Sequence, residues 1–355
     1  MQNEKSVLSS GGGQATNNSQ QKPRIAWIDW AKGWTIFFVV IFHALGSIHN
    51  ANVFSREYQY IGEYSMFLIG TFIMPVFFAL SGFVYKEVEN WNQYKVKMIR
   101  RIASLIVPYI IFSFLYVFMQ NISPGSSTHA IHHWDSLLWI FIQPISYLWY
   151  IYALVAIYLL AGILDMCKMG AKAQIVFSVL LFLIASYITL PPFISLMFTW
   201  NITFVMGRLL KKNKNMYQGN WCILSLIVIS VSWIFQVLFG GSSWYNTNGL
   251  TYVTFLSKVS SIIVVFCIYS RLHDNLFNKY FQSCGRDSLI IYLVHAPVVS
   301  VIRAILVKLG FLNYPLMLLI VIIIAWMISI FACYLSRKIK LIDFIFYPLR
   351  YINIM

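Results

Sequence analysis

The sequence predicts an all-α polytopic membrane protein of about ten transmembrane helices, with both ends of the chain in the cytoplasm. Of the 355 residues, 59% are hydrophobic and 10% are charged, and the mean hydropathy is +0.71. This composition leaves too little polar surface for a soluble domain of that length. Apolar runs of about 20 residues, the length that crosses a bilayer core, recur along the chain. Lysine and arginine concentrate in alternate connections between these runs.

The predicted elements follow one another from the N-terminus. Residues 1–23 are polar and rich in Gly, Ser, Asn and Gln, which predicts a disordered cytoplasmic tail. Residues 24–355 are expected to form one transmembrane domain. Its predicted spans are residues 27–48, 63–84, 103–121, 147–164, 174–191, 193–210, 221–239, 252–270, 288–306 and 315–335. The segment 134–143 is too short to cross and ends before Pro144, so we expect an interfacial or re-entrant helix on the outer side.

The basic residues indicate the orientation of these spans. With the N-terminus in the cytoplasm, 21 lysine and arginine residues fall on inner segments and three, Arg56, Arg303 and Lys308, on outer segments. The remaining two, Lys32 and Lys258, lie within spans. The net charge of +15 would suggest nucleic-acid binding in a soluble protein. Because the charge marks one membrane face here, we expect no nucleic-acid partner, and contact with membrane lipids instead.

Cysteines and histidines bear on disulfides and metals. The five cysteines have no CxxC spacing and lie in spans or inner loops, so we expect them to be reduced. They are Cys167, Cys222, Cys267, Cys284 and Cys333. The histidines of the segment HAIHHWD, His129, His132 and His133, have spacings that can present two metal ligands. No second cluster of Cys or Glu completes such a site, so we expect a polar outer loop and no metal.

The first predicted span carries three ionisable side chains, Asp29, Lys32 and His43. Such groups are costly within a bilayer, so each is a candidate functional residue. Lys32 and His43 are 11 residues apart, nearly three helical turns, which places them on one face about 16 Å apart. Asp29 lies near the same face. Two structural alternatives stay open: an interfacial ion pair between Asp29 and Lys32, and a buried His43 bonded to a neighbouring helix.

The segment RIAWIDWAKGWTIFFVVIFHALG, residues 24–46, resembles the first helix of the acyltransferase-3 family, and within it the fucose 4-O-acetylase-like branch. The family pattern is a basic residue, ten intervening residues and a histidine, positions that Lys32 and His43 occupy. The family more often has arginine at the first position. Four later segments resemble the family in the same order, so that the resemblance covers residues 24–340. They are FIMPVFFALSGFVYK (72–86), RRIASLIVPY (100–109), LWYIYALVAIYLL (148–160) and GRDSLIIYLVHAPVV (285–299).

The resemblance implies an O-acetyltransferase of the cell membrane. It would transfer an acetyl or other short acyl group from cytoplasmic acetyl-CoA to a hydroxyl of a cell-surface or lipid-linked glycan. His43 would deprotonate the hydroxyl or carry the acyl group, with Lys32 and Asp29 in the catalytic group and Lys32 also meeting the donor. Arg100 and Arg101, at the inner mouth of the third span, would hold the donor's phosphates. The alternative for both arginines is a role in topology alone.

Further polar and aromatic residues of these segments are candidates for substrate contact. They are Glu63, Ser81, Trp149, Tyr150, Tyr292 and His295. Structural alternatives stay open for several of them. Ser81 would serve helix packing beside Gly82, Tyr292 and His295 would form a hydrogen-bonded pair, and Glu63 would be an ordinary interfacial acid.

Two other functions are compatible with a polar first helix. A transporter or glycan flippase would use Asp29, Lys32 and His43 as a proton or substrate pathway, but the sequence has no duplicated halves of the kind that transporters often show. A regulatory protein with a degenerate site is a second alternative, and the intact spacing from Lys32 to His43 argues against it.

Overall fold

The computed structural model describes residues 25–122, 132–241, 244–245, 247 and 249–352, and within these residues the chain is helical without strands. Eight helical segments of this part are long and apolar enough to cross a membrane. They are α1 (Ala26–Asn50), α2 (Arg56–Val84), α3 (Trp91–Ile122), η3 with α4 (Ser146–Leu148 and Trp149–Met166), α6 (Pro192–Lys212), α7 (Trp221–Phe239), α10 (Ser288–Lys308) and α11 (Tyr314–Lys338). The all-α membrane class is therefore confirmed.

Two shorter helices occupy the remaining predicted spans. These are α5 (Ala171–Tyr187) and α8 (Phe255–Arg271), of 17 residues each. Ten spans and a cytoplasmic position of both termini stay predictions, and the predicted tail, residues 1–23, lies outside the described residues. At the expected interfacial segment the chain forms a short 3-10 helix, η2 (Trp134–Trp139). Helices α9 (Leu276–Arg286) and α12 (Lys340–Phe346), with the 3-10 turns η4 (Lys214–Tyr217) and η6 (Pro348–Arg350), were not expected.

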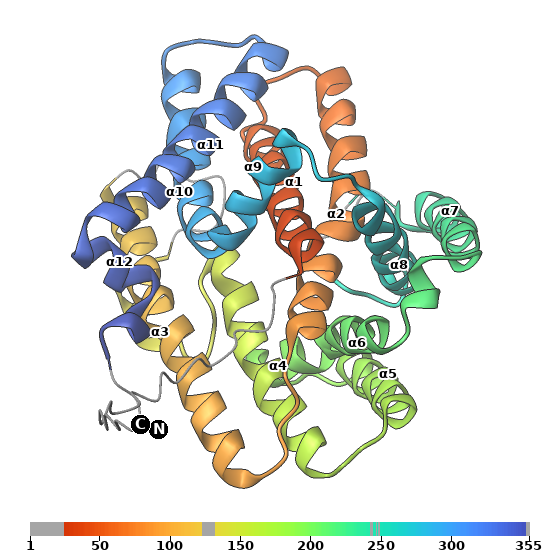
Figure 1. Ribbon diagram of the computed structural model, residues 1–355. Coiled ribbons are helices and arrows are strands. Elements are labelled where there is room, and N and C mark those ends of the chain that lie inside the picture. The colour runs from red at the N-terminus through yellow and green to blue at the C-terminus, as the bar shows by residue number, and fades with distance from the viewer. Residues whose placement is uncertain (1–24, 123–131, 242–243, 246, 248, 353–355) are drawn as a thin grey trace, which may run out of the picture.

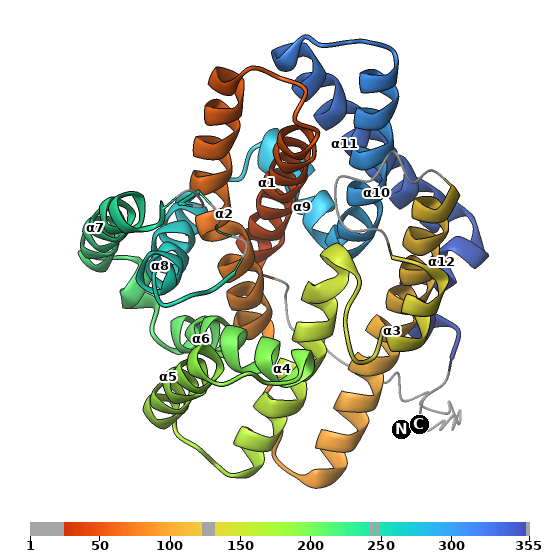
Figure 2. The ribbon, with the colours of Figure 1, turned by 180° about the vertical axis from the view of Figure 1, so that it is seen from behind.

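Helix α1 lies at the centre of the bundle, between α2 and α10, with α9 packed along it (Figure 1; Figure 2). Helices α5 and α7 lie at the periphery (Figure 1). More than half of the apolar stretch of α1 is buried, whereas α7 and α11 bury 28% of theirs. Apolar side chains on α7 and α11 therefore face outward, as expected of helices that contact lipid.

Paired glycines let the central helices approach each other closely. A side chain at Gly33 of α1 would overlap the carbonyl of Phe281 of α9, and a side chain at Gly285 of α9 would overlap the backbone of α1. Gly82 of α2 and Gly207 of α6 face each other's helix in the same way. Small residues at helix crossings allow this backbone contact. The first pair fixes α1 against α9 and so fixes the direction in which the polar face of α1 points.

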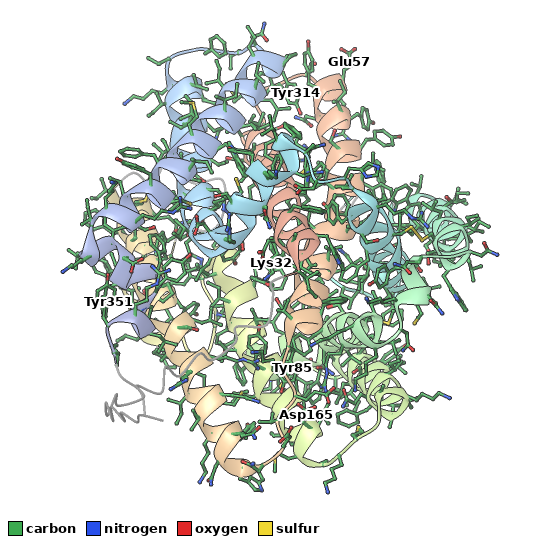
Figure 3. All side chains as sticks on the ribbon, viewed as in Figure 1. Lys32, Glu57, Tyr85, Asp165, Tyr314 and Tyr351 are labelled. Atoms are coloured by element: carbon green, nitrogen blue, oxygen red, sulfur yellow. A yellow bond between two sulfur atoms is a disulfide. The ribbon has the colours of Figure 1, made fainter. Side chains whose placement is uncertain are left out.

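A polar cluster ties the ends of α2, α4 and α6 together. The Asp165 carboxylate accepts hydrogen bonds from Arg208 Nη2 at 2.6 Å, the Tyr85 hydroxyl at 2.9 Å and the Val88 amide at 3.1 Å. Arg208 also donates to Glu87 at 3.2 Å. Tyr85 and Asp165 lie together toward one end of the bundle, and Lys32 lies nearer its middle (Figure 3). These bonds hold the ends of the three helices together beside a cavity of about 350 Å³ that Glu87, Asp165 and Arg208 help to line.

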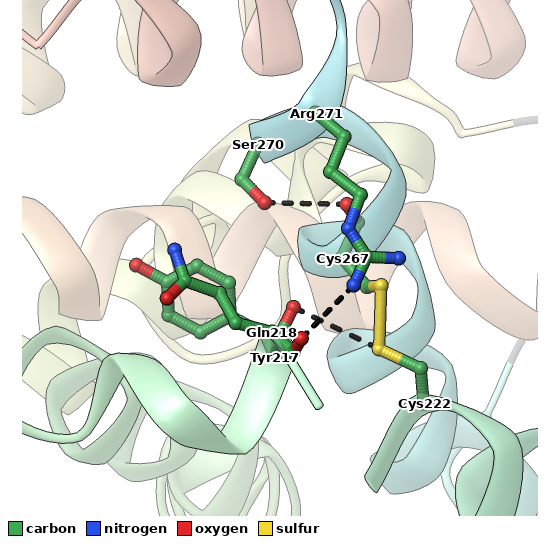
Figure 4. The surroundings of a disulfide bond; sticks show 6 residues. All are labelled: Tyr217, Gln218, Cys222, Cys267, Ser270 and Arg271. Carbon is green, nitrogen blue, oxygen red and sulfur yellow. Dashed lines mark hydrogen bonds between the residues drawn. A yellow bond between two sulfur atoms is a disulfide. The ribbon is translucent and has the colours of Figure 1, made fainter. Parts of the chain in front are cut away.

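One cysteine pair corrects the expectation that all five are reduced. Cys222 of α7 and Cys267 of α8 form a disulfide (Figure 4), with their Cα atoms 6.6 Å apart. The two residues are 45 positions apart in the chain, and the packing of α7 on α8 brings them together, which a search for CxxC spacing does not detect. The remaining cysteines are free thiols: Cys167, Cys284 and Cys333.

Candidate active site

The polar face of α1 opens into two adjoining cavities. The histidine cavity, of about 430 Å³, is lined by Val39, Phe42, His43, Gly70, Ile73, Met74, His132, Ser146, Tyr147, Trp149, Thr247 and Tyr292. The lysine cavity, of about 160 Å³, is lined by Lys32, Val39, Met74, Phe77, Ser81, Leu105, Tyr150, Ile151, Leu154, Ser288, Leu289 and Tyr292. Val39, Met74 and Tyr292 line both, so these three side chains form a common wall. Lys32 and His43 thus face two compartments that meet between them.

His43 is half-buried and lies against a second histidine. Its ring centroid is 4.9 Å from that of His295 on α10 and 6.5 Å from that of Tyr147. His295 is fully buried, and its Nδ1 hydrogen-bonds the carbonyl of Ile291 at 3.0 Å. Because a carbonyl only accepts, Nδ1 carries the proton and Nε2 is left as an acceptor. No hydrogen-bond partner of Nε2 exists among the described groups. His43 therefore has an imidazole neighbour that is itself held in one orientation.

Tyr292 and His295, for which a hydrogen-bonded pair was one alternative to substrate contact, each bond a backbone carbonyl instead. The Tyr292 hydroxyl donates to the carbonyl of Tyr147, and the Tyr147 hydroxyl donates to the carbonyl of Leu293 at 2.8 Å. These reciprocal bonds fasten η3 to α10. They hold the aromatic rings of Tyr147 and Tyr292 in the wall of the histidine cavity.

The remaining aromatic and hydroxyl candidates divide between the two cavities. Trp149 lines the histidine cavity, whereas Tyr150 and Ser81 line the lysine cavity. The Ser81 hydroxyl donates to the carbonyl of Phe77 at 3.0 Å and lies 3.4 Å from the Tyr150 hydroxyl. Ser81 therefore combines a structural bond within α2 with a place in the cavity.

Arg100 and Arg101 line neither cavity. Arg100 is exposed. The Arg101 guanidinium lies over the rings of Tyr85 and Tyr158, at 4.5 and 4.3 Å from their centroids. Its Nη1 is buried without a hydrogen-bond partner among the described groups. Arg101 is thus built into an aromatic layer, with one donor still available.

The two acidic candidates lie apart from the cavities. Asp29 lines neither of them. Glu63 is 1% exposed and forms an ion pair with Arg56 at 2.9 Å, so it lies buried within the bundle and is paired with an arginine of its own helix. Helix α2 begins at Arg56, earlier than the predicted start at residue 63. Arg56 and Glu63 are 7 residues apart, which is about two helical turns, so both side chains lie on the same face of the helix.

The histidines of the connection between α3 and α4 separate. His132 lines the histidine cavity, and its backbone is held by Gln120, which accepts from its amide at 2.9 Å, and by Asn121, which donates to its carbonyl at 2.9 Å. Burial lowers the pKa of His132, which keeps its imidazole neutral at neutral pH. His133 is exposed, and His129 lies outside the described residues. The described residues hold no group of three or more His, Cys, Asp or Glu placed to bind a metal.

Several residues of this site escaped the sequence reasoning. His132 was assigned to a polar loop, and Tyr147 and Thr247 were not singled out. Lys258 was noted within a span without a role, yet it is fully buried and its ammonium donates to the carbonyls of Gly70 and Thr247. A lysine inside an apolar span was the signal that pointed to it.

Comparison with known proteins identifies the family of the chain. A family model described as an acyltransferase domain matches residues 25–333, a range that contains every residue lining the two cavities. Searches of curated proteins and of solved structures find no match.

Proposed function

The chain belongs to the acyltransferase-3 family, whose domain spans residues 25–333, and from that premise we propose that it is an O-acetyltransferase of the cell membrane. The acyl donor is acetyl-CoA, and the acceptor is a hydroxyl of a cell-surface or lipid-linked glycan. The order and content of the motif segments support a position within the fucose 4-O-acetylase-like branch. The predicted topology puts the lysine cavity toward the cytoplasm and the histidine cavity toward the outside.

The observation that carries this proposal is the common wall of the two cavities. The lysine cavity is narrow, at about 160 Å³, and suits the linear pantetheine arm of the donor. The histidine cavity, at about 430 Å³ and lined by Trp149, Tyr147 and Tyr292, suits a sugar ring packed on aromatic faces. A thioester carbonyl at the common wall would meet a hydroxyl that enters from the other side.

The chemistry assigned to this junction is direct transfer. Neutral His43 removes the proton from the acceptor hydroxyl while its oxygen bonds to the acyl carbon. The carbon–sulfur bond breaks, and the CoA thiolate leaves and takes up a proton. His295, with its Nδ1 held by the Ile291 carbonyl, keeps the imidazole of His43 oriented. Bringing donor and acceptor together at one junction supplies much of the rate enhancement.

Charge on the donor side is met by basic residues. Lys32 lines the lysine cavity and would contact the polar part of the pantetheine arm. The exposed Arg100 would contact phosphates, since guanidinium groups bind phosphate well. The Nη1 of Arg101 is buried and lies over Tyr85 and Tyr158, so Arg101 would support this end of the site and would not contact the donor. We assign Asp29 no contact with either substrate because it lines neither cavity.

The test is acyl transfer by the purified protein, measured as isotope-labelled acetyl groups moved from acetyl-CoA to a panel of glycans. We expect His43→Ala to lower the rate by about 100- to 10,000-fold, the range for loss of a general base. His273→Ala is the matched control, since His273 is exposed and lines neither cavity. Full activity of His43→Ala would reject its role. Glycan movement that needs no acetyl-CoA would favour a flippase instead.

A further inference from the structure

The wall of the histidine cavity includes a proline-interrupted turn of α2. Gly70, Ile73 and Met74 line the cavity just before Pro75, which lies inside the helix. Proline has no N–H, so the carbonyl of Thr71, four residues earlier, loses its helical donor. In an apolar interior such a carbonyl needs another partner. The cavity wall is therefore the part of α2 that depends most on neighbouring groups.

Helix α8 supplies donors to this turn. The Ser261 hydroxyl, which also bonds within α8, lies 3.3 Å from the Thr71 carbonyl. The Lys258 ammonium donates to the Gly70 carbonyl at 2.7 Å and to the Thr247 carbonyl at 2.7 Å. Gly70 and Thr247 belong to different segments, and both line the histidine cavity. One ammonium group thus joins two sides of the cavity wall.

The segment that carries Thr247 lies directly on α2. A side-chain carbon at Gly70 would overlap the Thr247 hydroxyl, and that hydroxyl donates to the Met66 carbonyl at 3.3 Å. The contact therefore leaves no space for the two segments to come closer. Lys258 prevents them from separating, because its Nζ needs both carbonyls within hydrogen-bond distance.

Lys258 also supports the aromatic side of the same cavity. Its Nζ lies 5.8 Å from the ring centroid of Trp200, within the range of a cation–π contact. The Trp200 ring packs on that of Trp149, with centroids 5.3 Å apart, and Trp149 lines the cavity. Burying a lysine inside a membrane protein is energetically unfavourable. The Lys258 ammonium is stabilised here by two backbone carbonyls and by the Trp200 ring.

We propose that Lys258 is a positioning residue of the acceptor site: by bridging the Gly70 and Thr247 carbonyls it sets the shape of the histidine cavity without touching the substrate. Which substrate occupies that cavity rests on the proposed function, whereas the bridge itself does not. The bridge needs two donors and does not need a charge. Glutamine, whose amide has two N–H groups, can keep the bridge but not the contact of the charge with Trp200, and methionine, which has no donors, can keep neither.

Steady-state acyl transfer, with donor and acceptor varied separately, tests the role in the site. Loss of a bridge to two buried carbonyls should raise the acceptor KM of Lys258→Met about tenfold and leave the acetyl-CoA KM within about twofold. Lys258→Gln should raise the acceptor KM less than Lys258→Met does, because it keeps the two donors and loses only the contact of the charge with Trp200. Lys308→Met, a change at an exposed lysine, is the control. Equal changes in both KM values, or an acceptor KM of Lys258→Gln as high as that of Lys258→Met, would overturn the proposal.

A second measurement needs no enzymatic activity. Thr247→Cys, in a Cys167→Ser background, is labelled with a membrane-impermeant maleimide. Because Thr247 is 3% exposed, the cysteine should be labelled slowly when residue 258 is lysine or glutamine. In the Lys258→Met variant labelling should be about tenfold faster, because the lost bridge contributes about one hydrogen bond or more to holding the segment closed. Unchanged labelling of the Met variant overturns the bridge. If the labelling rates are as expected but the wild type shows no acyl transfer, the proposed function is rejected and the bridge is supported.

The tests stay decisive if Lys258→Met does not fold. Gly70→Ala then displaces the Thr247 segment while the lysine is intact, because the added carbon overlaps the Thr247 hydroxyl. A raised acceptor KM with an unchanged donor KM supports the cavity-shaping role. An unchanged acceptor KM overturns it.

Discussion

Replacing Asp165 by asparagine removes one charge from a buried ion pair. The side chains of Asp165 and Arg208 are 4% and 9% exposed, and their atoms approach to 2.6 Å. Asparagine keeps the size of the side chain but loses the negative charge. It also turns an N–H group toward donors that now bond the carboxylate, the Tyr85 hydroxyl and the Val88 amide. Arg208 is left buried with a weaker partner, Glu87, at 3.2 Å.

The size of the effect follows from this burial. Removing one partner of a buried pair costs about 3–5 kcal/mol, mainly because the other charge stays buried without compensation. Glu87 is 50% exposed and still bonds Arg208, so we expect the lower end, about 3 kcal/mol. At about 2 cal/mol/K of unfolding entropy per residue, the 355 residues convert this to a fall in Tm of about 4 °C.

The assay is thermal unfolding in a fixed detergent, followed by tryptophan fluorescence. Asp274→Asn is the matched control, because Asp274 pairs with Lys279 at 3.9 Å with both side chains more than half exposed, and such pairs contribute about 0–1 kcal/mol. The double variant Asp165→Asn/Arg208→Met should recover part of the loss, since no charge is then buried alone. A Tm of Asp165→Asn equal to that of Asp274→Asn would refute the reasoning.

Two further predictions concern helix packing and acid stability. Gly33→Leu should lower stability by about 1–3 kcal/mol or prevent folding, since its side chain meets the Phe281 carbonyl. Gly46→Ala, whose added carbon makes an ordinary contact with Met66, should not, and equal Tm values of the two would contradict this. Lys212, and then Arg208, hold the pKa of Glu87 below its usual value. A lowered pKa in the folded state gives stability that is present above the unfolded pKa, about 4.3, and is lost as the pH falls through the folded value. The wild-type Tm should therefore drop more steeply below about pH 4.3 than that of Glu87→Gln, and superimposable Tm curves would reject this.

The membrane class and the helix positions could be predicted because they depend on local properties. Hydropathy and proline placement located a helix at each of the ten predicted spans. Helical periodicity placed Lys32 and His43 on one face, and both line cavities that share Val39. Helix α9 escaped prediction because its 11 residues are too few and too polar to resemble a span.

The rest of the site depends on which helices become neighbours. Nothing near Lys258 in the chain indicates that its ammonium reaches Gly70, 188 residues away. The contact between His43 and His295, and the disulfide between Cys222 and Cys267, likewise arise from packing between distant segments. The pairing of Glu63 with Arg56 was not predicted because the start of α2 was placed too late. The spacing of residues within one helix predicted which side chains share a face, but it could not predict which helices pack against each other.

The wall shared by the two cavities has a consequence for the membrane itself. A hydrophilic route from one face of the bilayer to the other would dissipate ion gradients. Val39, Met74 and Tyr292 line both cavities, and these bulky side chains offer a passing ion no shell of ligands to replace its water. An acyl group needs to move only from one atom to another across such a wall. If the proposed acyl transfer takes place at this wall, a chemical group would pass between the two cavities while these side chains oppose the passage of ions.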